Sequence, residues 1–138
     1  MLFTTPKQFK EAIAEYAVHG GWGIGFVKND LQRIRAICQE NCKFVAYLTK
    51  VPRERSYQLR TLTLEHTCFR SYKNPRCTSP YIGKKLMKKV KRQPNIKVKD
   101  IQEVVHDNYT LNISARKASR ARDKAREYVD GAYIQQYN

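Results

Sequence analysis

Two pairs of metal-binding side chains, far apart along the chain, constrain its fold most. Cys38 and Cys42 are separated by three residues, 23 residues follow, and His66 and Cys68 are separated by one. Two short-range pairs joined by a longer segment are typical of four ligands that meet at one tetrahedral Zn²⁺. Thiolate and imidazole ligands favour zinc over magnesium or calcium. The spacing therefore predicts one zinc ion, whose ligands must converge when the chain folds.

The expected role of this zinc is structural. A catalytic zinc keeps one coordination position open for water and needs a nearby general base. Here four protein ligands close the shell, and no carboxylate is obviously placed to act as that base. The alternative for His66 and Cys68 is an unligated strand end. Cys77, the fourth cysteine, is expected to be a free thiol, with a replacement or additional ligand as its alternative.

The charge of the chain points to a polyanionic partner. The 138 residues include 27 Lys and Arg against 12 Asp and Glu, a formal charge of +15. This excess indicates nucleic acid or an acidic membrane surface. No apolar run approaches the roughly 20 residues that span a bilayer, and the N-terminal stretch has no secretory pattern. We therefore expect no membrane partner, metal-bound cysteines in a reducing compartment, and nuclear localisation.

The first half of the chain predicts one helix followed by a four-stranded antiparallel sheet. In TTPKQFKEAIAEYAVHGG (4–21), Thr5 is a good N-cap and Gly20-Gly21 a stop signal. After it, apolar residues recur with period two in runs separated by polar breaks. The runs are WGIGFVK (22–28), QRIRAIC (32–38), CKFVAYLTKV (42–51) and SYQLRTLTLEH (56–66). In such a meander the four candidate ligands lie at strand ends, which can converge at one edge.

The second half predicts three basic helices in a helix-turn-helix-like bundle. The segments are SPYIGKKLMKKVKRQP (79–94), KVKDIQEVVHDNYT (97–110) and ISARKASRARDKAREYVDGAYIQQYN (113–138), the last capped by Ser114. The expected fold class is therefore α+β. We expect a zinc-binding domain over residues 1–72, a connector over 73–80 and a helical domain over 81–138.

Several stretches resemble a known family of DNA-binding proteins. They are PKQFKEAIAEYAVHGGW, FVKNDLQRIRAIC, CKFVAYLTK, LRTLTLEHTCFRSYKN and the helical segments from KKLMKKVKRQPNIKVKDIQEVVHDNY onward. The zinc sheet resembles the WRKY and GCM domains, and the whole is more similar to the N-terminal region of plant Mutator-like (MuDR-type) transposases. The WRKYGQK heptad of the plant transcription factors is absent, so their base preference does not transfer. The DDE nuclease domain of such a transposase would lie outside these residues.

The resemblance implies that the first strand of the sheet enters the major groove of DNA. The matching positions are Gly25, Phe26, Lys28 and Asn29, where lysine suits guanine and asparagine suits adenine. Basic residues on the sheet are candidate phosphate contacts: Arg33, Arg35, Lys43, Lys50, Arg53, Arg55 and Arg60. A second set lies on the last helix: Arg116, Lys117, Arg120, Arg122 and Lys124. For each of these residues, a solvated surface charge is the alternative.

The sequence favours a zinc-dependent, sequence-specific binder of double-stranded DNA. The resemblance implies either recognition of terminal inverted repeats by a Mutator-like transposase or a transposase-derived transcription regulator. An RNA or single-strand binder is the alternative, since nine tyrosines and five phenylalanines offer stacking platforms. We expect no catalytic residues, because the scattered acidic residues form no two-metal carboxylate cluster. A homodimer through the C-terminal helices is compatible with DNA binding.

Overall fold

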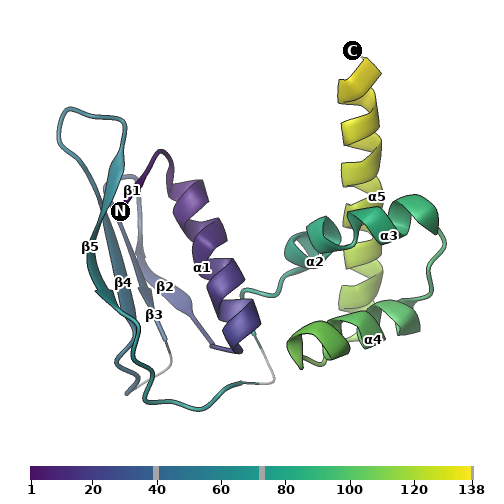
Figure 1. The fold of residues 1–138 in the computed structure, drawn as a ribbon, viewed down its shortest axis with the longest axis horizontal. Coiled ribbons are helices and arrows are strands. Elements are labelled where there is room, and N and C mark those ends of the chain that lie inside the picture. Colours follow the sequence, from purple (N-terminus) through teal and green to yellow (C-terminus); the bar gives the residue numbers. More distant parts are fainter. Residues whose placement is uncertain (39–40, 72–73, 138) are drawn as a thin grey trace. The chain divides into compact units, whose positions relative to one another are not determined.

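The computed structural model describes residues 1–38, 41–71 and 74–137, which form two compact units, Met1–Arg76 and Cys77–Asn138 (Figure 1). The first unit combines a helix with an antiparallel sheet, and the second is helical. The predicted α+β fold class is confirmed. Among the described residues, no helix has both the length and the apolar character needed to cross a bilayer.

Helix α1 (Pro6–Gly20) is confirmed with both predicted ends. The Thr5 side chain accepts the N–H of Gln8 at the start. At the end, Gly21 adopts a φ of 77°, and its N–H bonds the Ala17 carbonyl. This left-handed conformation is unstrained in glycine, so Gly21 allows the chain to turn sharply from the helix toward the sheet.

The sheet has five strands rather than the predicted four. The strands are β1 (Leu2–Phe3), β2 (Gly25–Asn29), β3 (Arg33–Ile37), β4 (Val45–Lys50) and β5 (Tyr57–Thr63). Their order is β1-β5-β4-β3-β2, and every pairing is antiparallel. The meander from β2 to β5 is confirmed. The missing strand, β1, has only two residues, and two residues cannot display a period-two pattern.

One face of the sheet packs against α1 and the other faces away from it. Ile34 and Ala36 of β3 and Leu48 of β4 are almost fully buried, in one cluster with residues of α1 such as Phe9. The alternating residues Arg33 and Arg35 are exposed, as the period-two pattern predicts. We call the side that carries them the outer face.

Two bulges shift the register between paired strands and so change which side chains are neighbours on the outer face. Val27 has no partner on β3, because Phe26 pairs with Ala36 and the next pair joins Lys28 to Arg35. Arg60 is likewise an additional residue in β5, because Thr61 pairs with Tyr47 and Leu59 pairs with Leu48. Such bulges re-aim the side chains that follow them. The bulge at Val27 therefore places Lys28 beside Arg35.

The chain that follows the sheet is tied back to the end of α1. The Ser71 N–H donates to the Gly21 carbonyl at 2.8 Å. The buried Asn74 side chain donates to the carbonyls of Ala17 at 2.9 Å and Trp22 at 3.2 Å. Asn74 is therefore part of the first unit, although it lies in the 73–80 segment expected as a connector. The boundary between the units falls between residues 76 and 77.

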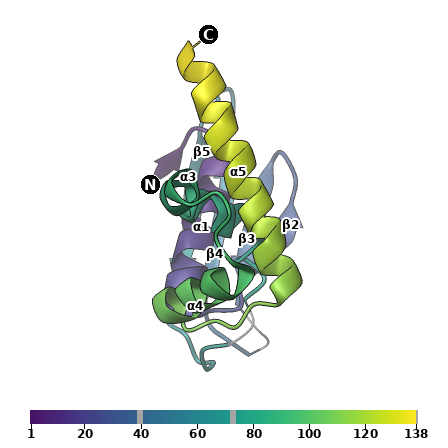
Figure 2. The same ribbon diagram turned by 90° about the vertical axis from the view of Figure 1, so that its right-hand side faces the viewer.

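Over its described residues, the second unit has four helices rather than the predicted three. The last of them runs toward the C-terminus (Figure 2). They are α2 (Ser79–Lys85), α3 (Met87–Arg92), α4 (Val98–Tyr109) and α5 (Ala115–Tyr137). The single helix expected over 79–94 is interrupted at Leu86, whose φ of −92° and ψ of −2° depart from ideal α-helical values. Both halves pack on α5. A Cβ at Gly83 would lie 2.8 Å from the Lys124 Cβ, so α2 approaches α5 closely before the chain bends.

Helix α5 provides the central surface of this unit. It begins where predicted, since the Ser114 side chain accepts the Lys117 N–H at 3.1 Å. Ala118, Ala121 and Ala125 are fully buried, and α2, α3 and α4 all pack on this helix. Small side chains at these positions allow three helices to pack around one.

Candidate functional site

The four predicted metal ligands converge at one end of the sheet. Cys38 directly follows β3, Cys42 lies shortly before β4, and His66 and Cys68 follow β5. Their ligand atoms all lie within 4.8 Å of one another. The prediction that strand ends bring them together is confirmed. The detail is different, because β5 ends at Thr63 and β4 begins at Val45, so the ligands lie on loops just beyond the strands.

The distances between the ligand atoms fit a tetrahedral zinc ion. The Cys38 and Cys68 sulfurs are 3.4 Å apart, the Cys42 sulfur is 3.4 Å from His66 Nδ1, and the Cys68 sulfur is 4.0 Å from that nitrogen. Zinc bonds of about 2.3 Å to sulfur and about 2.0 Å to nitrogen separate tetrahedral ligand atoms by about 3.5–3.8 Å. The four side chains can therefore hold one metal ion with little rearrangement.

Thr67 joins the two ligand-bearing loops. Its hydroxyl donates to the Asn41 carbonyl at 2.7 Å and accepts the Lys43 N–H at 3.2 Å. Asn41 itself has a φ of 64°, a left-handed conformation that asparagine tolerates better than most residues. Thr67, between His66 and Cys68, thus hydrogen-bonds to the two neighbours of Cys42 in sequence. These bonds fix the His66–Cys68 loop relative to the loop that carries Cys42.

The protein environment separates the acidities of two of the thiols. Burial opposes ionisation of Cys42, but hydrogen bonds from the backbone N–H groups of Phe44 and Thr67 and from neighbouring thiols lower its pKa to about 6. Burial and the hydrogen bonds of the neighbouring thiols raise the pKa of Cys68 to about 12. Because a metal binds the thiolate, a cation that binds here displaces the protons that these thiols carry.

The orientation of His66 is set by aromatic side chains. Its ring lies nearly parallel to those of Trp22, at 3.8 Å between centroids, and Phe44, at 4.9 Å. Nδ1 faces the sulfurs, and Nε2 lies 2.7 Å from the Tyr16 hydroxyl oxygen. With Nδ1 bound to a metal, Nε2 would carry the proton, and this N–H would donate a hydrogen bond to the Tyr16 oxygen. Burial, followed by the neighbouring sulfurs, raises the pKa of Tyr16, so its hydroxyl stays protonated.

Sequence reasoning did not identify these supporting residues. Tyr16 is at a core position of the α1 pattern, and Phe44 lies among apolar residues in a run typical of an ordinary strand. Tyr16 meets His66 across 50 residues of sequence. Only the position of Phe44, two residues after a metal ligand, was a local signal. Gly20 completes the arrangement, since a Cβ at that position would collide with the Trp22 indole.

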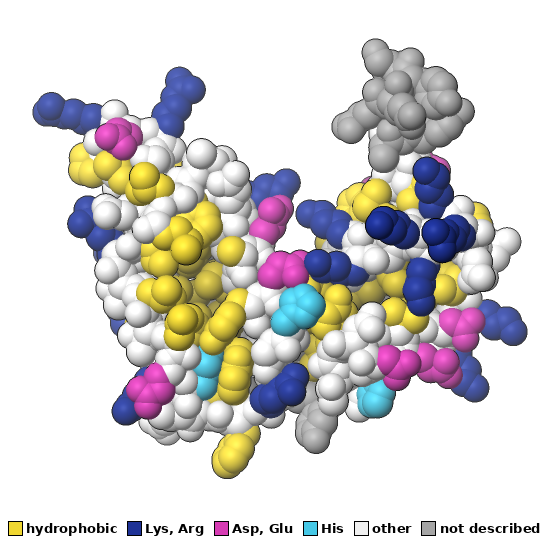
Figure 3. Space-filling model, viewed as in Figure 1, with side chains coloured by type: hydrophobic (Ala, Val, Ile, Leu, Met, Phe, Trp, Pro, Cys, Tyr) yellow, Lys and Arg dark blue, Asp and Glu magenta, His cyan; other side chains and the backbone are white. Residues whose placement is uncertain are grey.

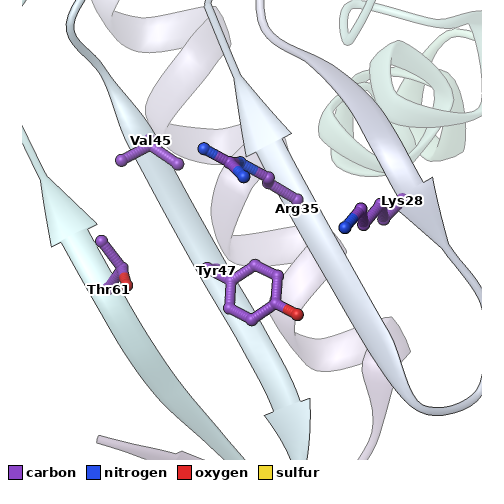
Figure 4. A pocket seen from close by; sticks show the side chains of 5 residues that line it. All are labelled: Lys28, Arg35, Val45, Tyr47 and Thr61. Carbon is purple, nitrogen blue, oxygen red and sulfur yellow. The ribbon is translucent and has the colours of Figure 1, made fainter.

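A row of polar and basic side chains crosses the outer face of the sheet. Lys28 of β2 pairs with Arg35 of β3, Arg35 with Tyr47 of β4, and Tyr47 with Thr61 of β5. Together with Val45 they line a hollow of about 250 Å³ (Figure 4). The Lys28 and Tyr47 side chains point toward β3 from opposite sides, and the Arg35 guanidinium leans over β4 toward Val45. We call these residues, without Val45, the cross-strand row.

The structure brings Lys28 and Arg35 together, and the other predicted contacts of β2 differ in their exposure. No atom lies within 4 Å of the position that a Cβ of Gly25 would take, and Asn29 is exposed. Phe26 packs against the core, and the Arg76 guanidinium lies 5.0 Å from its ring centroid. Its ring is therefore on the side of the sheet that packs against α1, not on the outer face. Four further basic residues are exposed on or beside the strands: Lys50, Arg53, Arg55 and Arg60.

Two predicted phosphate contacts on the sheet already have acidic neighbours. Arg33 lies 4.0 Å from the Asp30 carboxylate, and Lys43 lies 3.7 Å from that of Glu65. All four side chains are at least half exposed, and such pairs contribute little to stability. Both cations therefore stay available to an anionic partner.

The predicted residues on α5 are divided between the surface and the interior of the helical unit. Arg116 and Arg120 are exposed. Lys117 is half-buried, and Lys124 pairs with Glu127 at 3.5 Å. Arg122 points inward, donating from Nη1 to the Ile96 carbonyl at 3.0 Å, with its Nε buried. Buried in the same unit is Cys77, whose pKa is raised by burial. It is not one of the four clustered ligands.

Comparison with known proteins gives a distant likeness to a solved structure. No family model matches the chain, and no curated protein matches it. Among solved structures, it is similar to a crystal structure of AFT2 in complex with DNA, with a TM-score of 0.47 and 13% sequence identity. The alignment covers 78% of this chain and 86% of that one. A likeness at this level does not establish a shared fold.

Replacing one ligand is expected to release the metal and unfold the first unit. The Cys42→Ser variant should lose the stoichiometric zinc of the parent chain, because binding energy at a structural zinc is folding energy. Trp22, the single tryptophan, stacks on His66 and reports this change by fluorescence. Cys77→Ser is the matched control and should keep one zinc per chain. Equal zinc content in both variants would contradict the four-ligand assignment.

Removing the Tyr16 hydroxyl is expected to weaken zinc binding without abolishing it. In Tyr16→Phe the ring still stacks beside Phe44, but His66 Nε2 loses its hydrogen-bond partner. Loss of such a partner typically weakens metal affinity by about 10- to 100-fold. Competition with a chromophoric chelator measures the change, and Tyr47→Phe on the outer face is the control. Unchanged affinity in Tyr16→Phe would show that the hydroxyl does not position the ligand.

Proposed function

We propose that the chain is a zinc-stabilised protein that binds double-stranded DNA sequence-specifically. The observation that carries this proposal is the cross-strand row: two cations, a phenol and a hydroxyl lie side by side on the face of the sheet that α1 leaves open. Phosphate oxygens accept hydrogen bonds from all four of these groups. The high positive charge of the chain supports the same partner.

Strand β2 is the element best placed to contact bases. It is the edge strand of the sheet, so no further strand covers its outer side. Val27, Lys28 and Asn29 are exposed on it, and Gly25 leaves space for close approach. The major groove of DNA admits a two-stranded β-ribbon, which β2 and β3 would supply. In that groove, lysine pairs with guanine and asparagine with adenine. The residues of the cross-strand row would then position the sheet on the flanking backbone.

The proposed role of the metal centre is to hold the sheet in its DNA-binding form. The four protein ligands would complete the coordination of a zinc ion, which leaves no position for a reacting water molecule. We therefore propose a binding protein without catalytic activity of its own. The sulfur-rich ligand set supports zinc over harder divalent cations.

The finer identity that we propose rests on sequence resemblance. The similarity to the N-terminal region of Mutator-like transposases supports a nuclear protein that recognises terminal inverted repeats, or a regulator derived from one. Selection of bound sequences from a random duplex library tests this directly. A consensus found in inverted repeats supports the transposase context, and one found only in promoters supports the regulator.

Self-association through the C-terminal helices is part of the same proposal. Transposon ends occur in pairs, so a dimer would suit their recognition. Static light scattering at the concentrations used for DNA binding distinguishes a monomer from a dimer.

Neutral substitutions in the cross-strand row are expected to weaken duplex binding. Lys28→Gln with Arg35→Gln removes two cations that phosphates or bases would contact, and affinity for duplex DNA should fall by about tenfold or more at 100 mM salt. Fluorescence anisotropy with duplex DNA, single-stranded DNA and RNA at matched salt measures the effect. Lys7→Gln, exposed on α1, is the control. Tighter binding of RNA or single strands, with Tyr47 as stacking platform, would favour the alternative function instead.

A further inference from the structure

The helical unit separates its charges to an unusual degree. Residues 84–99 contain eight Lys or Arg and no Asp or Glu. The next ten residues, 100–109, contain three acidic residues and no Lys or Arg. A surface adapted only for solubility mixes both signs. The division therefore indicates a directional interaction with an anionic partner.

Packing on α5 fixes which side of α2 and α3 faces solvent. Ile82, Leu86 and Val90 are buried, and both helices pack on α5. The bend at Leu86 keeps all three apolar residues on the buried side. The basic residues between and directly after them are all exposed: Lys84, Lys85, Lys88, Lys89, Lys91 and Arg92. We call these six residues the α2–α3 basic surface, and Figure 3 shows Lys and Arg side chains gathered over these helices.

Two arginines of α5 support the segment that follows α3. Arg122 donates to the Ile96 carbonyl at 3.0 Å, and Arg126 Nε donates to the Pro94 carbonyl at 2.8 Å. A second nitrogen of Arg126 bonds the Asn95 side chain at 3.3 Å. These guanidinium groups are used inside the unit and hold the 94–96 segment to α5. Two of the basic residues of α5 thus have an internal role, and α2 and α3 carry more exposed basic residues than α5 does.

We propose that the α2–α3 basic surface binds the phosphate backbone of duplex DNA without regard to sequence. This rests on the proposed function, and it assigns the second contact to residues that sequence reasoning had placed on α5. Five of the six residues are lysines. A lysine ammonium is a flexible point charge that neutralises phosphates, whereas base discrimination favours the rigid fork of arginine. The surface therefore adds affinity, and β2 of the sheet supplies selectivity.

Two charge-matched double variants of the full zinc-loaded chain test the proposal. Lys88→Gln with Lys89→Gln removes two charges from α3, and Arg116→Gln with Arg120→Gln removes two from α5. All four residues are exposed, and glutamine keeps a good helix propensity. Affinity is measured by anisotropy on a selected target duplex and on a random duplex of equal length, over a series of salt concentrations. Thermal unfolding shows that each variant remains folded.

The α3 variant is expected to bind both duplexes about tenfold more weakly at 100 mM salt. Its preference for the target should not change, and the slope of log K against log salt should fall by about 1.8, since each lost phosphate contact removes about 0.9. The α5 variant should lose clearly less. Equal losses in both variants, an unaffected α3 variant, or a changed sequence preference would overturn the proposal. If the parent chain binds neither duplex, the proposed function itself fails.

Discussion

The meeting of four ligands at one end of the sheet is the interaction on which the first unit depends. Three cysteine sulfurs and one imidazole nitrogen lie within 4.8 Å of one another. A cation between them would offset the repulsion of the thiolates and join the ends of β3, β4 and β5. Among the described residues, these loops are also linked by the Thr67 hydrogen bonds to Asn41 and Lys43, by the ion pair of Lys43 with Glu65 and by the stack of Phe44 on His66. The small core of this unit gains from such a crosslink.

The stack around His66 connects this crosslink to the rest of the unit. Tyr16 brings α1 into contact with the ligand, Trp22 brings the turn after α1, and Phe44 brings the strand that follows Cys42. The same turn is tied to the chain beyond Cys68 through the bonds of Ser71 and Asn74. The metal centre and the hydrophobic core are therefore continuous. Within the first unit, the outer face of the sheet lies opposite α1.

Features with a local signal could be predicted from the sequence. Thr5 and Gly21 marked the ends of α1, alternation marked β2 to β5, and the ligand spacing marked the metal centre. Features set by distant contacts could not. The interruption at Leu86 lies between two helices that both pack on α5, and the contact of Tyr16 with His66 joins residues far apart in the chain. The cross-strand row was predicted only in part, because its alignment depends on a bulge at Val27 that no residue pattern announces.

The two units divide the positive charge almost equally but use it differently. The first has 13 Lys and Arg against 6 Asp and Glu, and the second has 14 against 6. In the first, the two cations, the phenol and the hydroxyl of the cross-strand row lie side by side across β2 to β5, an arrangement suited to specific contacts. In the second, lysines crowd one helical surface, an arrangement suited to general attraction. Under the proposed function, one chain would combine selectivity with affinity, because the second contact becomes intramolecular once the first has formed.

The affinity of the chain for duplex DNA as a function of zinc occupancy shows whether the metal centre holds the sheet in its DNA-binding form. The metal-free chain is titrated with zinc, and DNA binding and bound zinc are measured on the same samples. We predict that DNA binding rises in proportion to bound zinc and saturates at one ion per chain. Full DNA binding by the metal-free chain would contradict this role of the metal. So would full DNA binding by a chain whose ligands Cys38, Cys42, His66 and Cys68 have been replaced.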